Sequence, residues 1–246
     1  MRLALFADIH ANRQAFAACL EAARALGAER VVCLGDIVGY GADPEWAVDT
    51  VIDLVEDGAL AVRGNHDNAI GSSAESMNAE AQAAIEWTRG RLSAPQRRFL
   101  SELPLEQNED DRLYVHSEAS SPARWRYVQD AADAARSIIA TPAQITFCGH
   151  IHRPALYSMS VTAKMTSFIP VSGVPVQLLQ GRRWLAVLGS VGQPRDGNPA
   201  ASFAMFDTEK REIVFCRAPY DVAAAAKKIR DNGLPLWLAG RLSAGR

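Results

Sequence analysis

Residues 3–10 read LALFADIH, a short apolar run that ends in the motif Asp8-Ile9-His10. An unbroken apolar run of this length is typical of a strand buried on both faces, as in a parallel sheet covered by helices. The following residues have apolar side chains at helical spacing, with Asn12 placed to cap that helix and Gly27 placed to end it. The start of the chain therefore predicts a strand, a polar strand end and a helix, which is the repeating unit of an α/β fold.

The same alternation continues as far as residue 152. Apolar runs at 31–34, 60–62, 113–115 and 144–148 alternate with helical patterns at 44–55, 75–92, 95–103 and 130–140. This β-α-β order predicts a largely parallel sheet covered by helices. After residue 152 the runs at 156–161, 174–179, 184–187, 202–207 and 212–217 are predicted as consecutive strands of a second, mostly antiparallel sheet, followed by a helix at 222–231. No linker is evident, so residues 1–246 are expected to form one domain of two packed sheets.

Polar motifs stand at the ends of the predicted strands, and they contain all five histidines of the chain. The motifs are Asp8-Ile9-His10, Gly35-Asp36, Gly64-Asn65-His66-Asp67, Val115-His116-Ser117 and Gly149-His150-Ile151-His152. Because the carboxyl ends of parallel strands meet at one edge of a sheet, these side chains are expected to converge there. Imidazole, carboxylate and amide oxygen are ligands for divalent metals, and Asp36 has two oxygens with which to bridge two ions. The pattern predicts a hydrolytic two-metal centre.

The composition and net charge of the chain argue against some classes of function. The chain has 246 residues, 48% of them apolar, with a net charge of −2 and a pI of about 6.2. The acidic balance and the lack of a segment dense in Lys and Arg argue against a nuclease acting on nucleic-acid polymers. No apolar run is long enough to span a membrane, no signal-peptide pattern is evident, and the four cysteines form no C-x-x-C pair. We therefore expect a cytoplasmic protein with reduced cysteines and no membrane partner.

The five motifs, in this order, resemble the signature of the calcineurin-like metallophosphoesterase superfamily. The segments 189–199 and 233–242 are also similar to the small bacterial and archaeal branch that contains the YfcE-type phosphodiesterases. The resemblance implies an α/β fold, a four-layer α/β/β/α sandwich of two packed mixed sheets with helices outside and a metal site at the strand ends. It also implies a hydrolase that cleaves small phosphodiesters or phosphomonoesters by attack of metal-bound hydroxide at a two-metal centre.

The resemblance carries over to individual residues. It implies that one ion is held by Asp8, His10, Asp36 and His152, and the other by Asp36, Asn65, His116 and His150. It implies that His66 is catalytic instead of a ligand, and contacts the scissile phosphate or its leaving group. Two Mn²⁺ ions are expected, with Fe, Zn²⁺, Ni²⁺ or Mg²⁺ as alternatives, because a mixed imidazole and carboxylate set suits several metals.

One departure from the superfamily pattern bears on the substrate. Relatives that act on phosphoproteins have Asp-Arg-Gly after the Gly-Asp motif, whereas this chain has Gly39-Tyr40-Gly41. We therefore expect the protein to bind a small phosphate ester as its substrate. The sequence leaves open whether the protein forms a homo-oligomer. The rival interpretation is a protein-binding scaffold without catalysis, since a fold does not imply a function. A scaffold is free to lose ligands or His66, and this chain retains all of them.

Three further segments are open to two interpretations each. Arg195 either grips a substrate phosphate or ties a loop through structural bonds. The cluster Arg124-Trp125-Arg126-Tyr127 either lines a substrate cleft or anchors a loop through its aromatic rings. The apolar tail, residues 234–242, either packs on the body of the protein or contacts a second copy.

Overall fold

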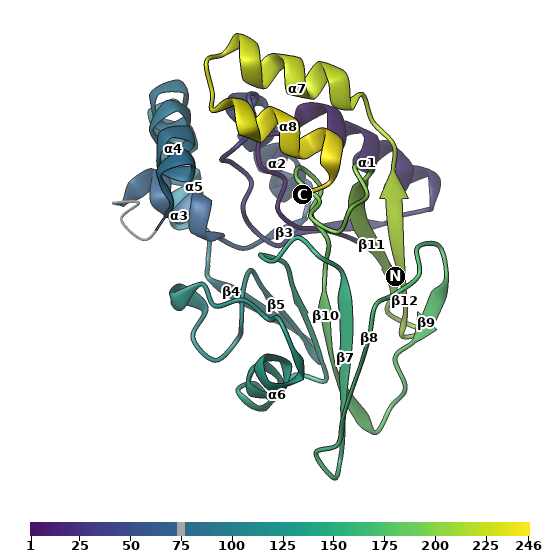
Figure 1. Cartoon of the computed structure of the whole chain (residues 1–246). Coiled ribbons are helices and arrows are strands. Elements are labelled where there is room, and N and C mark those ends of the chain that lie inside the picture. The colour runs from purple at the N-terminus through teal and green to yellow at the C-terminus, as the bar shows by residue number, and fades with distance from the viewer. Residues whose placement is uncertain (73–76) are drawn as a thin grey trace.

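The computed structural model describes residues 1–72 and 77–246, and two six-stranded sheets pack face to face in it (Figure 1). Sheet A has the order β3 (Leu60–Ala61), β2 (Arg30–Cys33), β1 (Arg2–Phe6), β11 (Ala201–Asp207), β12 (Glu212–Ala218) and β9 (Pro175–Gln177). Sheet B has the order β4 (Glu106–Glu109), β5 (Arg112–Val115), β6 (Ile145–Cys148), β10 (Arg182–Val187), β7 (Ala155–Ser160) and β8 (Met165–Phe168).

Both sheets are mixed, and this corrects one expectation from the sequence. Strands β1, β2 and β3 are parallel in sheet A, and β5, β6 and β10 are parallel in sheet B. The strands after residue 152 do not form a sheet of their own, because β11, β12 and β9 extend sheet A while β10, β7 and β8 extend sheet B. The separate antiparallel sheet was therefore wrong. Residues 201–206 are buried throughout, and a strand buried on both faces needs the central place that β11 takes beside β1.

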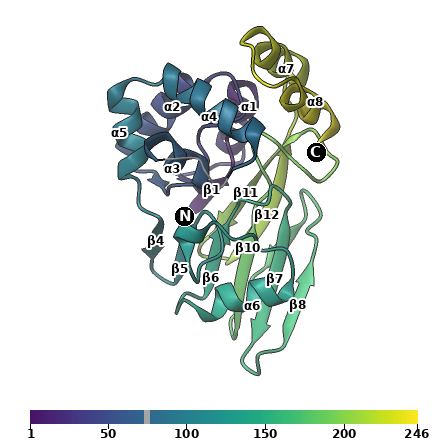
Figure 2. The ribbon, with the colours of Figure 1, turned by 60° about the vertical axis from the view of Figure 1, so that its left-hand side comes forward.

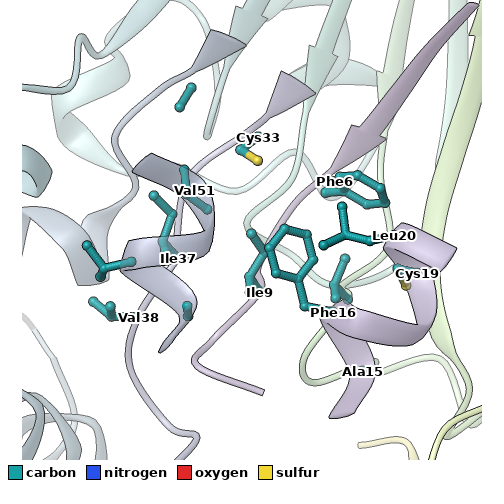
Figure 3. Close-up of a cluster of buried hydrophobic side chains, with 14 of the residues drawn as sticks. Phe6, Ile9, Ala15, Phe16, Cys19, Leu20, Cys33, Ile37, Val38 and Val51 are labelled. Carbon is teal, nitrogen blue, oxygen red and sulfur yellow. The ribbon is translucent and has the colours of Figure 1, made fainter. Parts of the chain in front are cut away.

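Alternating side chains of the strands divide the interior into three apolar layers. Leu3 and Leu5 of β1 point into the core between the sheets, whereas Ala4 and Phe6 point outward to the helices. Helix α1 (Arg13–Ala25) covers that outer face of sheet A, where the Phe6 and Phe16 rings meet edge to face at 5.5 Å (Figure 3). Helix α6 (Ala131–Ile139) covers the outer face of sheet B beside β7 and β10 (Figure 2). Three cores between four layers confirm the α/β/β/α sandwich.

The remaining helices are α2 (Pro44–Glu56), α3 (Asn65–Gly71), α4 (Ala79–Arg91), α5 (Ala94–Glu102), α7 (Val222–Asp231) and α8 (Leu236–Ala244). Asn12 caps α1 as expected, because its side-chain oxygen accepts from the backbone N–H of Ala15 at 3.1 Å. The helix expected over 75–92 begins at Ala79 in the structure, and Glu75 lies outside the described residues. The sequence patterns did not predict α3, α8, β4 or β8.

The apolar tail forms α8 and packs on the body of the protein. Leu238 and Leu242 are buried in one cluster with Tyr40 and with Ala81 of α4. This packing is the first of the two interpretations given for the tail. Among the described residues, no helix combines the length and apolar character that crossing a membrane requires. The four cysteines are free, and three of them are buried.

Candidate metal centre

The parallel strands of the two sheets end at one shared edge, and the predicted site residues meet there. Asp8 and His10 follow β1, Asp36 follows β2, and Asn65 and His66 begin α3 after β3. His116 follows β5 in sheet B, and His150 and His152 follow β6. All of them are buried except Asn65, which is half-buried.

The first cluster of ligand-type atoms contains Asp8, His10 and His152. The Nε2 atoms of His10 and His152 lie 3.0 Å apart, and Asp8 Oδ1 lies 3.3 Å from the Nε2 of His152. Asp8 is also fixed through its second oxygen, Oδ2, which accepts from the backbone N–H of His150 at 2.9 Å. These atoms are close enough together to share one ion.

The second cluster contains Asp36, His116 and His150, with Asn65 beside it. The Nε2 of His116 lies 3.4 Å from Asp36 Oδ2, 3.1 Å from His150 Nδ1 and 3.1 Å from Asn65 Oδ1. Asp36 Oδ2 also lies 3.7 Å from the Nε2 of His10 in the first cluster. The same carboxylate oxygen thus faces both clusters, which is the position that a bridging ligand needs.

The outward nitrogen of each of these four imidazole rings faces a backbone carbonyl. His10 Nδ1 lies 3.2 Å from the Val38 oxygen, His116 Nδ1 2.7 Å from Leu34, His152 Nδ1 2.7 Å from Gln193, and His150 Nε2 2.8 Å from Trp125. A carbonyl only accepts, so the outward nitrogen of a neutral ring carries the hydrogen and the inward nitrogen presents a lone pair. This is how proteins orient histidines that bind metals.

The resulting donor set fits a divalent cation. Two lone pairs that face each other, as at the Nε2 atoms of His10 and His152, repel unless a proton or a metal ion lies between them. The buried Oδ1 of Asp8 has no hydrogen-bond partner among the described residues. Buried acceptors of this kind cost free energy without a compensating partner. A cation bound to each cluster would satisfy them.

The titration behaviour of the histidines agrees with such a role. Burial lowers the pKa of His150 to about 3, so its ring is neutral at pH 7, the state in which imidazole binds metals. Burial also opposes charge on His116, but the charge and hydrogen bonding of Asp36, together with Asp8 and the Leu34 carbonyl, outweigh it and raise the pKa of His116 to about 9. His116 therefore holds an additional proton at pH 7 in the metal-free protein, and a metal ion would have to displace it.

Backbone strain is concentrated at the same residues. Five predicted ligands have positive φ angles: Asp8 (55°), His10 (50°), Asp36 (51°), His150 (71°) and His152 (61°). The left-handed region costs a residue with a side chain roughly 1–2 kcal/mol. Such strain persists where the surrounding structure requires it, and it gathers at functional sites.

His66 is buried beside the first cluster and lines the cleft. Its backbone N–H donates to Asp36 Oδ1 at 2.8 Å, and its ring contacts those of Tyr40 and His10 at 4.5 and 4.9 Å. Its ring atoms are also within reach of His10 and Asp36, so geometry alone does not separate a ligand from a catalytic group. Burial lowers its pKa to about 4 despite the opposing charge of Asp36. Gly39 makes room for this ring, since a Cβ there would lie 2.3 Å from His66 Nδ1.

Asp67 and Tyr40 are two supporting residues around the centre. Asp67 accepts from the backbone N–H groups of Ile37, Val38 and Gly64 at 2.9–3.2 Å, which ties the Gly-Asp motif to the start of α3. Burial and the charge of Asp36 raise the pKa of Asp67 to about 7. Tyr40 was not predicted as a site residue, and the flanking Gly39 and Gly41 were the signal in the sequence that its segment makes close contacts.

An open cleft of about 330 Å³ lies over the clusters. It is lined by Asp36, Tyr40, Asn65, His66, Met77, Asn78, Ala81, Arg124, Trp125, Tyr127, His150, His152 and Arg195. The guanidinium of Arg195 donates to Gln193 Oε1 at 2.8 Å and lies 5.8 Å from the centre of the Tyr40 ring. Three residues of the cluster 124–127 thus reach the cleft, which agrees with the first interpretation of that cluster.

Comparison with known proteins assigns the chain to a family. Residues 1–211 match the model of the calcineurin-like phosphoesterase superfamily domain. The chain is 34% identical to the uncharacterized protein MJ0912 of Methanocaldococcus jannaschii, over 99% of this chain and 98% of that one. A crystal structure of a metallophosphoesterase from Sphaerobacter thermophilus is 33% identical, with a TM-score of 0.88 over 100% of this chain and 99% of that one. The hypothetical protein PH1004 from Pyrococcus horikoshii OT3 shares the fold at 19% identity, with a TM-score of 0.79 over 100% and 98% of the two chains. The family match and the relative that covers nearly the whole chain show that this protein belongs to the calcineurin-like phosphoesterase superfamily.

Proposed function

We propose that this protein is a metal-dependent phosphoesterase that hydrolyses small phosphodiesters or phosphomonoesters at a two-metal centre. The observation that carries the proposal is the pair of ligand clusters joined by Asp36 beneath an open cleft. A scaffold without catalysis has no need to keep strained, buried carboxylates and imidazoles in this arrangement. The complete donor set therefore favours the enzyme.

The proposed ligands divide as the two clusters do. One ion would be held by Asp8, His10, Asp36 and His152, and the other by Asp36, Asn65, His116 and His150. When bound, the ions would supply Lewis-acid stabilisation of the phosphate charge and make water a better nucleophile near neutral pH. We propose Mn²⁺ as the resident metal, with Fe, Zn²⁺, Ni²⁺ or Mg²⁺ as alternatives, because a donor set of imidazole, carboxylate and amide oxygen suits several divalent ions.

Hydrolysis requires proton transfer that the chain itself can provide. The oxygen of water bonds to phosphorus and gives up one proton to the solvent, the bond to the leaving oxygen breaks, and the leaving oxygen takes up a proton. His66 lies in the cleft between Tyr40 and the Asp36 carboxylate, where its ring can give that proton. Its pKa of about 4 leaves it neutral in the free protein, and the negative charge of a bound phosphate raises the pKa of a neighbouring imidazole.

Stripping the protein of metal is expected to abolish its turnover of bis(p-nitrophenyl) phosphate, because the clusters then lack their Lewis acid. Reloading with Mn²⁺ should restore release of p-nitrophenolate and give two ions per chain by elemental analysis. Phosphoserine proteins should be poor substrates, since Gly39-Tyr40 replaces the residues that support phosphoprotein hydrolysis in relatives. Saturation at one ion per chain would contradict the two-metal centre. Efficient action on phosphoproteins alone would contradict the proposed substrate class.

Replacing Arg195 with lysine is expected to raise KM by roughly tenfold, the effect of losing a charge-assisted hydrogen bond of about 1.5 kcal/mol. The Arg195 guanidinium lies in the cleft, where it can bond two phosphate oxygens in a fork that lysine cannot reproduce. Its bonds to Gln193 also allow a structural role. Kinetics and thermal unfolding separate the two, because a structural role would lower the melting temperature and leave KM unchanged.

The cellular setting is part of the same proposal. The cysteines form no disulfide within residues 1–72 and 77–246, which supports a reducing, cytoplasmic location. A net charge of −2 supports small anionic substrates over nucleic-acid polymers. Assembly of this chain into a homo-oligomer stays an open expectation from the sequence.

A further inference from the structure

The segment 122–127 forms one wall of the cleft and is held firmly in place. The carbonyl of Pro122 accepts from Ser117 Oγ at 3.1 Å, and that of Arg126 accepts from the backbone N–H of Glu118 at 3.1 Å. Trp125 has a positive φ of 52°, and its carbonyl contacts the outward nitrogen of His150. The wall is therefore tied to residues around His116 and to the ring of His150.

Tyr127 lies flat on the ring of one proposed ligand. Its ring is stacked on that of His150, with centroids 4.3 Å apart and planes 19° from parallel. Tyr127 is nevertheless 41% exposed, and it lines the cleft together with Trp125. An aromatic side chain that is stacked on one face, is still partly exposed and lines a cleft offers a platform for a second flat ring.

Arg124 adds a free positive charge to the same wall. It is exposed and lines the cleft, and within the described parts of the chain its guanidinium has no hydrogen bond or ion pair. Arg126, two residues further on, is equally exposed but does not line the cleft. A guanidinium at the mouth of a cleft stacks on flat rings and attracts anions.

Resting on the proposed function, we propose that Tyr127 and Arg124 form a subsite for a planar ring on the phosphate ester, such as a nucleobase or an aryl group. The stacking of Tyr127 on His150 places the platform beside the second ligand cluster. A ring joined to the scissile phosphate by a short linkage can therefore lie on Tyr127 while the phosphate lies over the clusters. The substrate class is a phosphodiester with a flat, unsaturated ester group, in preference to one with a small alkyl group.

Two diesters with the same leaving group test the proposal. Thymidine 5′-(p-nitrophenyl phosphate) and methyl p-nitrophenyl phosphate both release p-nitrophenolate. A third diester, bis(p-nitrophenyl) phosphate, shows whether an aryl group is preferred as strongly as a nucleobase. The Mn²⁺-loaded protein is expected to favour the diesters that carry a second ring, on the ester group that does not leave, by about tenfold or more in kcat/KM, as base stacking on an aromatic side chain allows. The preference should lie mostly in KM.

Substitutions in residues 124–127 test whether this substrate preference comes from Tyr127 and Arg124. Tyr127→Leu is expected to bring the ratio of the two kcat/KM values close to one, Tyr127→Phe to keep it, and Arg124→Gln to reduce it severalfold. Arg126→Gln is the matched control, with the same loss of charge on the neighbouring surface and an unchanged ratio. If Tyr127 only steadies His150, Tyr127→Leu will slow both substrates by the same factor and weaken Mn²⁺ binding.

The outcomes for the unaltered protein keep the two proposals apart. Turnover of both diesters with a ratio near one would overturn the subsite and leave the phosphoesterase standing. Turnover of neither diester and no turnover of the monoester p-nitrophenyl phosphate, in protein shown to hold its metal, would overturn the proposed function and the subsite with it.

Discussion

Replacing Asp36 with asparagine is expected to reduce kcat/KM by at least about 1,000-fold, equivalent to about 4 kcal/mol of transition-state stabilisation. Asp36 Oδ2 faces His116 at 3.4 Å and His10 at 3.7 Å, so it is the single oxygen that joins the two ligand clusters. Asparagine keeps the shape, and its oxygen can still accept from the His66 N–H. Its amide nitrogen then takes the place of Oδ2, where a donor replaces the negative acceptor.

The same substitution should lower the metal content from two ions per chain to one or none. Asp53→Asn is a suitable control, because Asp53 is an exposed aspartate in the last turn of α2, outside both clusters. It removes the same charge, and its metal content and kinetics should match those of the unaltered protein. If Asp36→Asn keeps both ions and full activity, the assignment of Asp36 as the bridge is wrong.

The residues of the centre could be predicted from the sequence because they stand in local signals. Asp8, Asp36 and His116 each end a short apolar run, and parallel strands that share a sheet must bring such ends together. The cap at Asn12 is equally local, since a side-chain oxygen needs only the next turn of the chain. These features depend on neighbours in sequence.

The partition of strands between the sheets depends on distant residues. The pairing of β1 with β11 places Arg2 opposite Asp207. The pattern of side chains in residues 202–207 does not indicate which strand lies beside them. The sequence predicted the hairpin between β11 and β12, because its turn is local. Which sheet the hairpin joins depends on where both faces of β11 can be buried, and that position is beside β1. The resemblance to a family implied two mixed sheets but not which strands each contains, and periodicity could not supply that either.

Tyr40 and Tyr127 show why parts of the site could not be predicted. Tyr40 contacts His66 only because Gly39, with a φ of 91°, turns the chain back toward α3. Tyr127 contacts His150 across a gap of 23 positions that no motif spans. Contacts of this kind depend on the path of a loop, for which a single sequence carries little pattern.

Replacing His66 with alanine is expected to reduce kcat on an alkyl phosphodiester by roughly 10²–10⁴-fold, the range for loss of a general acid, while both ions are retained. The hydrogen bond from residue 66 to Asp36 Oδ1 comes from the backbone N–H, so alanine preserves it and Asp36 keeps its orientation. Only the ring is lost. Elemental analysis of the variant should still find two ions per chain, and loss of one would show that His66 is a ligand.

Substrates with different leaving groups test whether the ring of His66 donates a proton or only binds the phosphate. A group that gives a proton to the leaving oxygen matters most where that oxygen is strongly basic. His66→Ala should therefore slow an alkyl phosphodiester far more than a p-nitrophenyl one, whose leaving group departs without help. If His66 instead only binds the phosphate, both substrates will slow by the same factor, because the phosphate is common to them. Gly39→Ala provides a second check, since a Cβ 2.3 Å from His66 Nδ1 must displace the ring or the backbone around it, and elemental analysis must still find both ions in that variant. That variant should show the same dependence on the leaving group as His66→Ala if proton donation needs the ring where the structure places it.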